Sequence, residues 1–247
     1  MKPPPAGSIL APGYPVFLEL HGVPVLVVGG GAVAARKVAD LALSHARVTI
    51  VSPAMNEELI ALGKVMRAST FPLKLIKRRF RPGDMRGMRL IFAATDDPVL
   101  NARICRTAQA KRLLANCAAP PEAGNFAVPA TVRRGLFCLA ISTGGTSAAL
   151  AAHWRERLEK ITGNEWGTLA SLLWKKRREV KTRIADADIR REVLTTLGHP
   201  YWAVKIKKSG IKAIERRMDA LIASAATASD KCAVAFARGR GQGKRKK

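Results

Sequence analysis

The chain has 247 residues, 48% of them hydrophobic, which suffices for one large or two modest domains with a buried core and excludes wholesale disorder. No apolar stretch approaches the ~20 residues needed to span a bilayer, so we expect no membrane partner. The 43 Lys and Arg against 18 Asp and Glu give a net charge of +25, which favours anionic partners without choosing among polyphosphate, polycarboxylate and nucleic acid.

The beginning of the chain predicts a flexible leader over residues 1–13, which contain four prolines and two glycines. It carries no apolar region of the secretory type, and we therefore expect a cytoplasmic protein. The four cysteines lack C-x-x-C spacing and are expected to be reduced, with two or three simply buried. No metal cage can be derived from them or from the four scattered histidines.

Short apolar runs then alternate with helical patterns. A valine-rich run over residues 23–28 ends at Gly29-Gly30-Gly31, and residues 32–43 show helical spacing. Further strand candidates cover residues 47–51, 73–79, 90–94 and 113–117, with a helix at about 99–111. This order predicts an α/β fold, in which a Rossmann-like parallel sheet covered on both faces occupies residues 14–117.

The pattern changes after this region. Residues 126–132 and 136–142 predict two strands around Arg133-Arg134-Gly135, a hairpin rather than another β–α unit. From Thr146 the pattern is helical, with a break at residues 198–200, and predicts a helical domain over residues 148–223. Residues 224–247 become rich in small residues and then in cations and glycine, which predicts a basic disordered tail.

The Gly-rich segment fits a dinucleotide-binding fingerprint, Gly29-x-Gly31-x-x-Ala34. In such a turn the glycines bring backbone N–H groups close to a pyrophosphate, at the N-terminus of a helix that attracts the anion. A structural turn is the alternative, but the position between a strand and a helix favours the cofactor. We therefore predict that Gly29, Gly31, Ala32 and Val33 bind the pyrophosphate.

The acid that binds the ribose in such folds is expected ~20 residues further on. Val51-Ser52-Pro53 stand there, so the Ser52 hydroxyl or backbone groups near Pro53 are the candidates for the ribose. No arginine follows the strand to bind a 2′-phosphate, which favours NAD over NADP.

Several blocks together resemble one family, the precorrin-2 dehydrogenases that also form the N-terminal module of siroheme synthases. The blocks are Tyr14-Pro15-Val16-Phe17-Leu18-Glu19-Leu20, Val27-Val28-Gly29-Gly30-Gly31-Ala32-Val33-Ala34-Ala35-Arg36-Lys37, Ala93-Ala94-Thr95-Asp96-Asp97 with Asn101, Asn116, Asn125-Phe126 with Pro129, and Ser142-Thr143-Gly144-Gly145-Thr146-Ser147. The glycine motif alone is generic, whereas its combination with the other blocks is specific. The similarity is firm over residues 14–160.

The resemblance implies a homodimer with a dimerisation segment over residues 118–147, and NAD-dependent oxidation of precorrin-2 to sirohydrochlorin. Some members of the family also insert ferrous iron. The resemblance adds Thr95, Asp96 and Asn116 to the predicted cofactor site. The substrate has eight carboxylates, and the candidates to bind it are Thr143, Gly144, Arg133, Arg134 and Arg155.

One departure from the family concerns its aspartate, three residues after the asparagine of the N-x-x-D block, which is held to act in catalysis. This position is Ala119 here, so the catalytic acid stays unknown, and Glu122, Asp96 and Asp97 are the substitutes we consider, with Glu122 and Asp97 as the candidates. Asp96-Asp97 can equally be an ordinary helix cap before Pro98. Hydride transfer can persist through positioning alone, while iron insertion is left open.

Three functions remain, in this order. The first is the NAD-dependent dehydrogenase, with or without weak ferrochelatase activity. The second is a dinucleotide- and tetrapyrrole-binding carrier or sensor without catalysis, which Ala119 supports. The third is nucleic-acid binding, which the charge suggests but which no interleaved aromatic motif supports, since only 5% of residues are aromatic.

Overall fold

The chain divides into two compact units in the computed structural model, which describes the backbone of residues 13–242 and the side chains of residues 13–229. The first unit contains the residues up to Pro129 together with Ser142–Ala148. The second contains Ala130–Ile141 and the residues from Ala149 onwards. The predicted hairpin is thus grouped with the helices, and the loop that follows it is grouped with the sheet.

The first unit is built on a five-stranded parallel sheet with the order β3-β2-β1-β4-β5. Its strands are β1 (Pro24–Val28), β2 (Arg47–Ser52), β3 (Lys74–Lys77), β4 (Leu90–Ala93) and β5 (Leu114–Cys117). Its α-helices are α1 (Ala32–Leu43), α2 (Glu57–Val65) and α3 (Pro98–Ala110), and short 3-10 turns η1 (Met66–Ala68), η2 (Pro82–Met85) and η3 (Pro121–Ala123) complete it. The predicted α/β fold is confirmed; α2, capped by the Asn56 side chain, was not predicted.

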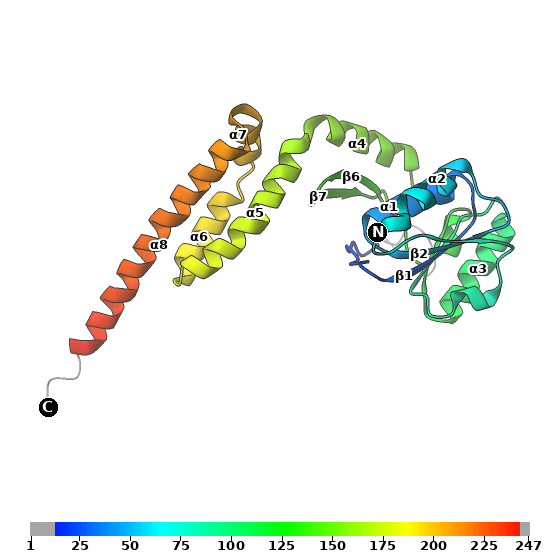
Figure 1. Cartoon of the computed structure of the whole chain (residues 1–247), viewed down its shortest axis with the longest axis horizontal. Coiled ribbons are helices and arrows are strands. Elements are labelled where there is room, and N and C mark those ends of the chain that lie inside the picture. Colours follow the sequence, from blue (N-terminus) through cyan, green and yellow to red (C-terminus); the bar gives the residue numbers. More distant parts are fainter. Residues whose placement is uncertain (1–12, 243–247) are drawn as a thin grey trace, which may run out of the picture. The chain divides into compact units, whose positions relative to one another are not determined.

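Both faces of the sheet are buried, as the continuous apolar strands predict. On one face α1 and α2 pack on alternate strand residues that include Val25, Val27 and Phe92. On the other, α3 packs on residues that include Leu26 and Ile91 (Figure 1). This arrangement leaves the carboxyl ends of the strands as the edge at which loops and helix N-termini meet.

The second unit consists of an antiparallel hairpin, β6 (Ala130–Arg134) with β7 (Phe137–Ile141), and helices. The helices are α4 (Ala148–Ile161), α5 (Asn164–Arg183), α6 (Ala187–Leu197), α7 (Tyr201–Ser209) and α8 (Ile211–Gln242). A shared apolar core joins α5 to α8. A buried cation reinforces it, because Lys176 of α5 contacts Glu179 on its own helix at 3.2 Å and Asp219 on α8.

Helix α8 corrects the predicted start of the tail at residue 224, because it continues to Gln242. The small residues that suggested disorder include many alanines, and alanine has the highest helix propensity. Met218, Ile222 and Ala226 also recur every four residues and are buried, so the helical face extends past the predicted boundary. The remainder of the tail, 243–247, and residues 1–12 of the leader lie outside the described residues.

The cysteines with described side chains are unpaired. Cys105 on α3 and Cys117 on β5 are buried, and burial raises the pKa of the Cys105 thiol to about 12. A thiol with so high a pKa stays protonated and unreactive at neutral pH. These two residues therefore serve as small apolar core residues, as predicted.

Candidate functional site at the carboxyl edge of the sheet

The candidate site lies where the strand order reverses, between β1 and β4. Gly29 follows β1 and Thr95 comes shortly after β4, so the Gly-rich turn and the Thr95 loop meet at the same edge. In open parallel sheets, ligands bind in the crevice at such a switch point. The fold therefore places the predicted cofactor residues at the expected position for a dinucleotide.

Two of the three glycines, Gly29 and Gly30, are required for the packing of the protein's own backbone. Gly29 has a φ of +126°, and a Cβ there would lie 2.1 Å from the Ala94 carbonyl oxygen. At Gly30 a Cβ would lie 1.9 Å from the carbonyl oxygen of Ala54. Both glycines thus allow close packing of backbone against backbone, and they fix the shape of the turn.

Gly31 differs, because a Cβ there would meet no atom within 4 Å and its φ is an ordinary −85°. It is the N-cap of α1, and neither a side-chain cap nor an acidic residue occupies the first turn. The N–H groups of Ala32 and Val33, two exposed residues, have no intrahelical acceptor at such a position. Open space, free donors and the positive end of the helix dipole together fit a pyrophosphate.

The end of β2 and the loop after it hold the other side of the turn. Gly29 N donates to Val51 O at 3.0 Å, and Asn56 N donates to Gly30 O at 2.8 Å. Ser52 is buried at the end of β2 and Pro53 is exposed. A ribose contact by these two residues stays a prediction.

The Thr95 loop is organised by Asn101, which is fully buried on α3. Its Oδ1 accepts from Thr95 N at 3.0 Å and from Thr95 Oγ1 at 2.7 Å. Its Nδ2 donates to Thr95 O at 3.0 Å and to Ala119 O at 3.2 Å. One amide therefore fixes both the loop after β4 and the loop after β5, while Asp96 remains exposed.

Replacing Asn101 with alanine should lower the free energy of unfolding by at least about 2 kcal/mol, because each buried polar group left without a partner costs about 1–3 kcal/mol. Chemical denaturation measures the loss. Thr107, a half-buried residue on the same helix whose hydroxyl donates to Arg103 O, provides the control: Thr107→Ala should change stability far less. Equal stability of Asn101→Ala and the unmodified protein would contradict this role.

Asn116, predicted to bind the cofactor, uses its side chain within the protein. It is buried near the end of β5, and its Nδ2 donates to Phe126 O at 3.1 Å. Its Oδ1 accepts from Lys37 Nζ of α1 at 2.8 Å. Lys37 was not among the predicted site residues, although a cation four residues before the buried Leu41 is a signal that it lies on an apolar face.

The candidate acids have different surroundings. Asp97 caps α3, since its Oδ1 accepts from Val99 N at 2.9 Å and from Leu100 N at 3.0 Å, as the alternative interpretation predicts. Glu122 is exposed in η3, three residues after Ala119. Ala119 is itself exposed at the carboxyl edge.

The predicted substrate residues lie in and around the hairpin. Thr143 and Gly144 form a loop after β7, in which Thr143 Oγ1 donates to Ser147 O at 3.0 Å. Arg133 is exposed on β6, and Arg155 on α4 lies 3.8 Å from Glu156. A role of any of these in substrate binding stays a prediction.

Arg134 makes backbone contacts that the sequence did not predict. Its Nε donates to Thr162 O at 2.9 Å and its Nη2 to Glu159 O at 3.2 Å. A cation at these carbonyls stabilises the C-terminal end of α4. Part of its hydrogen-bonding capacity is thus used in holding the hairpin to α4.

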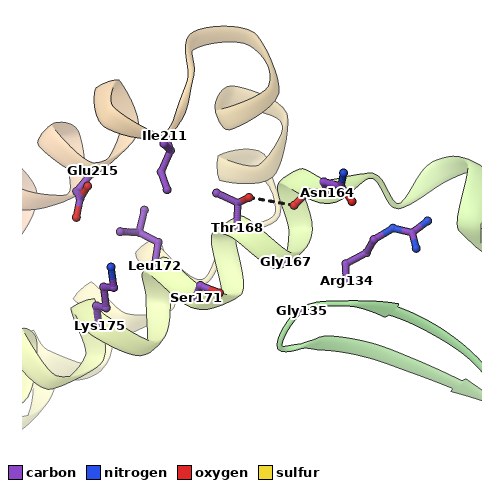
Figure 2. A pocket seen from close by; sticks show the side chains of 10 residues that line it. All are labelled: Arg134, Gly135, Asn164, Gly167, Thr168, Ser171, Leu172, Lys175, Ile211 and Glu215. Carbon is purple, nitrogen blue, oxygen red and sulfur yellow. Dashed lines mark hydrogen bonds between the residues drawn. The ribbon is translucent and has the colours of Figure 1, made fainter. Parts of the chain in front are cut away.

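The second unit contains a cavity of about 440 Å³ between the hairpin turn, α5 and the start of α8. Figure 2 shows Arg134 extending below Asn164, away from Lys175. The lining mixes one carboxylate with cations and hydroxyls: Glu215, Lys175, Thr168 and Ser171. Separately, residues 13–229 contain no group of three His, Cys, Asp or Glu side chains arranged to hold a metal ion.

Comparison with known proteins agrees with this geometry. Residues 16–130 match a family described as "Putative NAD(P)-binding". The siroheme synthase of Thioalkalivibrio sulfidiphilus is 40% identical over 72% of this chain and 35% of its own length. That of Actinobacillus succinogenes is 34% identical over 83% of this chain and 42% of its own length. The chain is a relative of the siroheme synthases.

The chain thus spans less than half the length of these relatives. A solved structure of SirC, a precorrin-2 dehydrogenase, superposes with a TM-score of 0.68 over 86% of this chain and all of SirC, at 24% identity. That match supports the fold. The resemblance derived from the sequence and the nicotinamide dinucleotide cofactor are both confirmed.

No helix within residues 13–242 combines the length and the apolar character that a membrane span requires.

Proposed function

We propose that the chain is a precorrin-2 dehydrogenase, which oxidises precorrin-2 to sirohydrochlorin with NAD. The observation that carries the proposal is the open, uncapped N-terminus of α1 at Gly31, set at the switch point of the sheet. The similarity to siroheme synthases over most of this chain directs it to tetrapyrrole chemistry. The lack of an arginine directly after β2, where one would bind a 2′-phosphate, favours NAD over NADP.

The protein's own contribution is binding and orientation. The free N–H groups at the start of α1 hold the pyrophosphate, and the Asn101 amide fixes the two loops between which the reacting rings would lie. When bound, NAD⁺ supplies the acceptor for the hydride. No carboxylate stands at Ala119, so we assign ferrochelatase activity at most a weak role.

The chain is further proposed to act as a cytoplasmic homodimer, with Thr143, Gly144, Arg133 and Arg134 near the substrate. One feature of the hairpin supports the dimer. Leu136 at its turn is 66% exposed, an apolar group that a second protomer could cover.

A carrier or sensor of dinucleotide and tetrapyrrole is the second candidate, and Ala119 is the observation that favours it. Anaerobic turnover of precorrin-2 with NAD, followed by ultraviolet–visible absorbance with and without ferrous ion, separates the two. The dehydrogenase produces the sirohydrochlorin spectrum and stoichiometric NADH. Binding of both ligands without any NADH would overturn the enzyme in favour of the carrier.

Deleting residues 238–247 should leave turnover nearly unchanged, because every predicted cofactor and substrate residue precedes them. The measurement is turnover of the truncated chain against the full chain at equal NAD and precorrin-2 concentrations. The deletion removes six cations, so it also tests the nucleic-acid alternative. Loss of activity on truncation, or sequence-selective DNA binding by the full chain, would count against the dehydrogenase.

A further inference from the structure

Lys37 is a partly buried cation at the edge of the candidate site that forms no salt bridge within residues 13–229. It lies on the buried side of α1, three residues after Ala34 and four before Leu41. Its Nζ lies 5.5 Å from the centre of the Phe92 ring and 2.8 Å from Asn116 Oδ1. Among residues 13–229 no carboxylate forms a salt bridge with it.

Such an environment disfavours an ammonium. Burial lowers the pKa of Lys37, with a further contribution from the neighbouring Arg36, while Asp40 acts in the opposite direction. An ammonium has three N–H donors, and the contact with Asn116 uses one of them. A partly desolvated charge with spare donors gains more from an incoming anion than a solvated surface lysine does.

The neighbours hold this group in place. The Asn116 side chain accepts from Lys37 and donates to the Phe126 carbonyl. The Phe92 and Phe126 rings pack edge to face, with their centroids 5.5 Å apart. Both polar atoms of the Asn116 side chain are therefore used within the protein. The Lys37 ammonium is the group at this part of the carboxyl edge that has donors available for a ligand.

We propose that Lys37 binds a carboxylate of the tetrapyrrole substrate. The pyrophosphate is the other anion at this edge, but its predicted site is Gly31, which lies six residues earlier and thus about 9 Å along the axis of α1. Lys37 reaches instead to β5, which is two strands from β1, or about 10 Å across the sheet. The inference depends on the proposed function for the nature of the substrate.

The experiment measures binding rather than turnover. Uroporphyrin, a porphyrin with eight carboxylates, is titrated into the full chain and followed by fluorescence. Lys37→Gln keeps a donor for Asn116 without the charge, and should weaken uroporphyrin binding about 10-fold, since a charged hydrogen bond contributes about 1.5–3 kcal/mol. Lys37→Arg keeps the charge and should stay within about threefold.

Lys64, exposed near the end of α2, is the matched control for loss of one positive charge. Lys64→Gln should bind uroporphyrin like the unmodified protein, and NAD affinity should be unchanged in all three variants. Three results would overturn the proposal. They are equal weakening by Lys64→Gln, weakening of NAD rather than uroporphyrin by Lys37→Gln, and loss of uroporphyrin binding in Lys37→Arg as severe as in Lys37→Gln.

A second measurement does not depend on the variants' affinity. In protein labelled with ¹⁵N-lysine, the Lys37 Nζ resonance is assigned by its absence in Lys37→Arg, and its pKa is followed by NMR. Saturating uroporphyrin should raise that pKa, and an unchanged pKa would contradict the contact. Precorrin-2 turnover without Lys37-dependent binding overturns this inference alone, whereas Lys37-dependent binding without turnover overturns the dehydrogenase and retains the site.

Discussion

Replacing Gly31 with valine should weaken NAD binding by at least about 100-fold while the melting temperature stays nearly unchanged. The backbone at Gly31 is in an extended conformation that valine adopts readily, and no protein atom lies within 4 Å of the added Cβ. The side chain would instead occupy the space through which the pyrophosphate approaches. Losing two hydrogen bonds to an anion, at about 1.5–3 kcal/mol each, corresponds to this factor.

Two further substitutions give that result its meaning. Gly83→Val is the matched control, because a Cβ at Gly83 would also have no atom within 4 Å, yet this residue lies in η2, away from the Gly-rich turn. It should leave NAD affinity unchanged. Gly30→Ala should prevent stable folding, since its Cβ would overlap the Ala54 carbonyl. Unaltered NAD affinity in a folded Gly31→Val protein would show that the Gly-rich segment is only a structural turn.

Most of the sheet could be predicted from the sequence because the strands β1, β2 and β4 are buried on both faces. Each of these appears as a short, mostly apolar run, and the observed β1 and β2 differ from the predicted ranges by one residue at an end. The position of Gly31 could be predicted for a related reason, since a turn between such a strand and a helix has few solutions. At the buried strands and at the turn containing Gly31, the local sequence pattern and the fold of the unit favour the same structure.

The side-chain partners in the site could not be predicted in the same way. Asn116 resembled a ligand-binding residue, yet its partners are Lys37, 79 positions earlier, and Phe126, 10 positions later. Arg134 likewise contacts the carbonyl of Thr162 across 28 positions. Pairings over such separations depend on how the elements pack, which a periodic pattern does not encode.

The second large effect is expected from placing at position 119 the carboxylate that the family resemblance implies. Ala119→Asp should raise insertion of ferrous iron into sirohydrochlorin by about 100-fold, since a positioned acid or base contributes ~10²–10⁴-fold when it acts directly. The backbone there is fixed, because Ala118 N donates to Ala93 O at 2.9 Å and Ala119 O accepts from Asn101 Nδ2 at 3.2 Å. The exposed position gives an aspartate room at the carboxyl edge. Oxidation of precorrin-2 should change less, because hydride transfer depends chiefly on how substrate and NAD lie against each other.

Glu122 and Asp97 are the acids that could already supply this function. Asp97→Asn keeps an N-cap for α3, so it should preserve stability, and its effect on chelation reports on the carboxylate alone. Glu122→Gln removes the exposed acid nearest in sequence to Ala119. If one of these two changes abolishes iron insertion and Ala119→Asp raises its rate only slightly, the acid that was removed is the one that transfers the proton. If the unmodified protein inserts iron rapidly and none of the three changes alters the rate, the hypothesis that a carboxylate at the carboxyl edge transfers the proton is wrong for this protein.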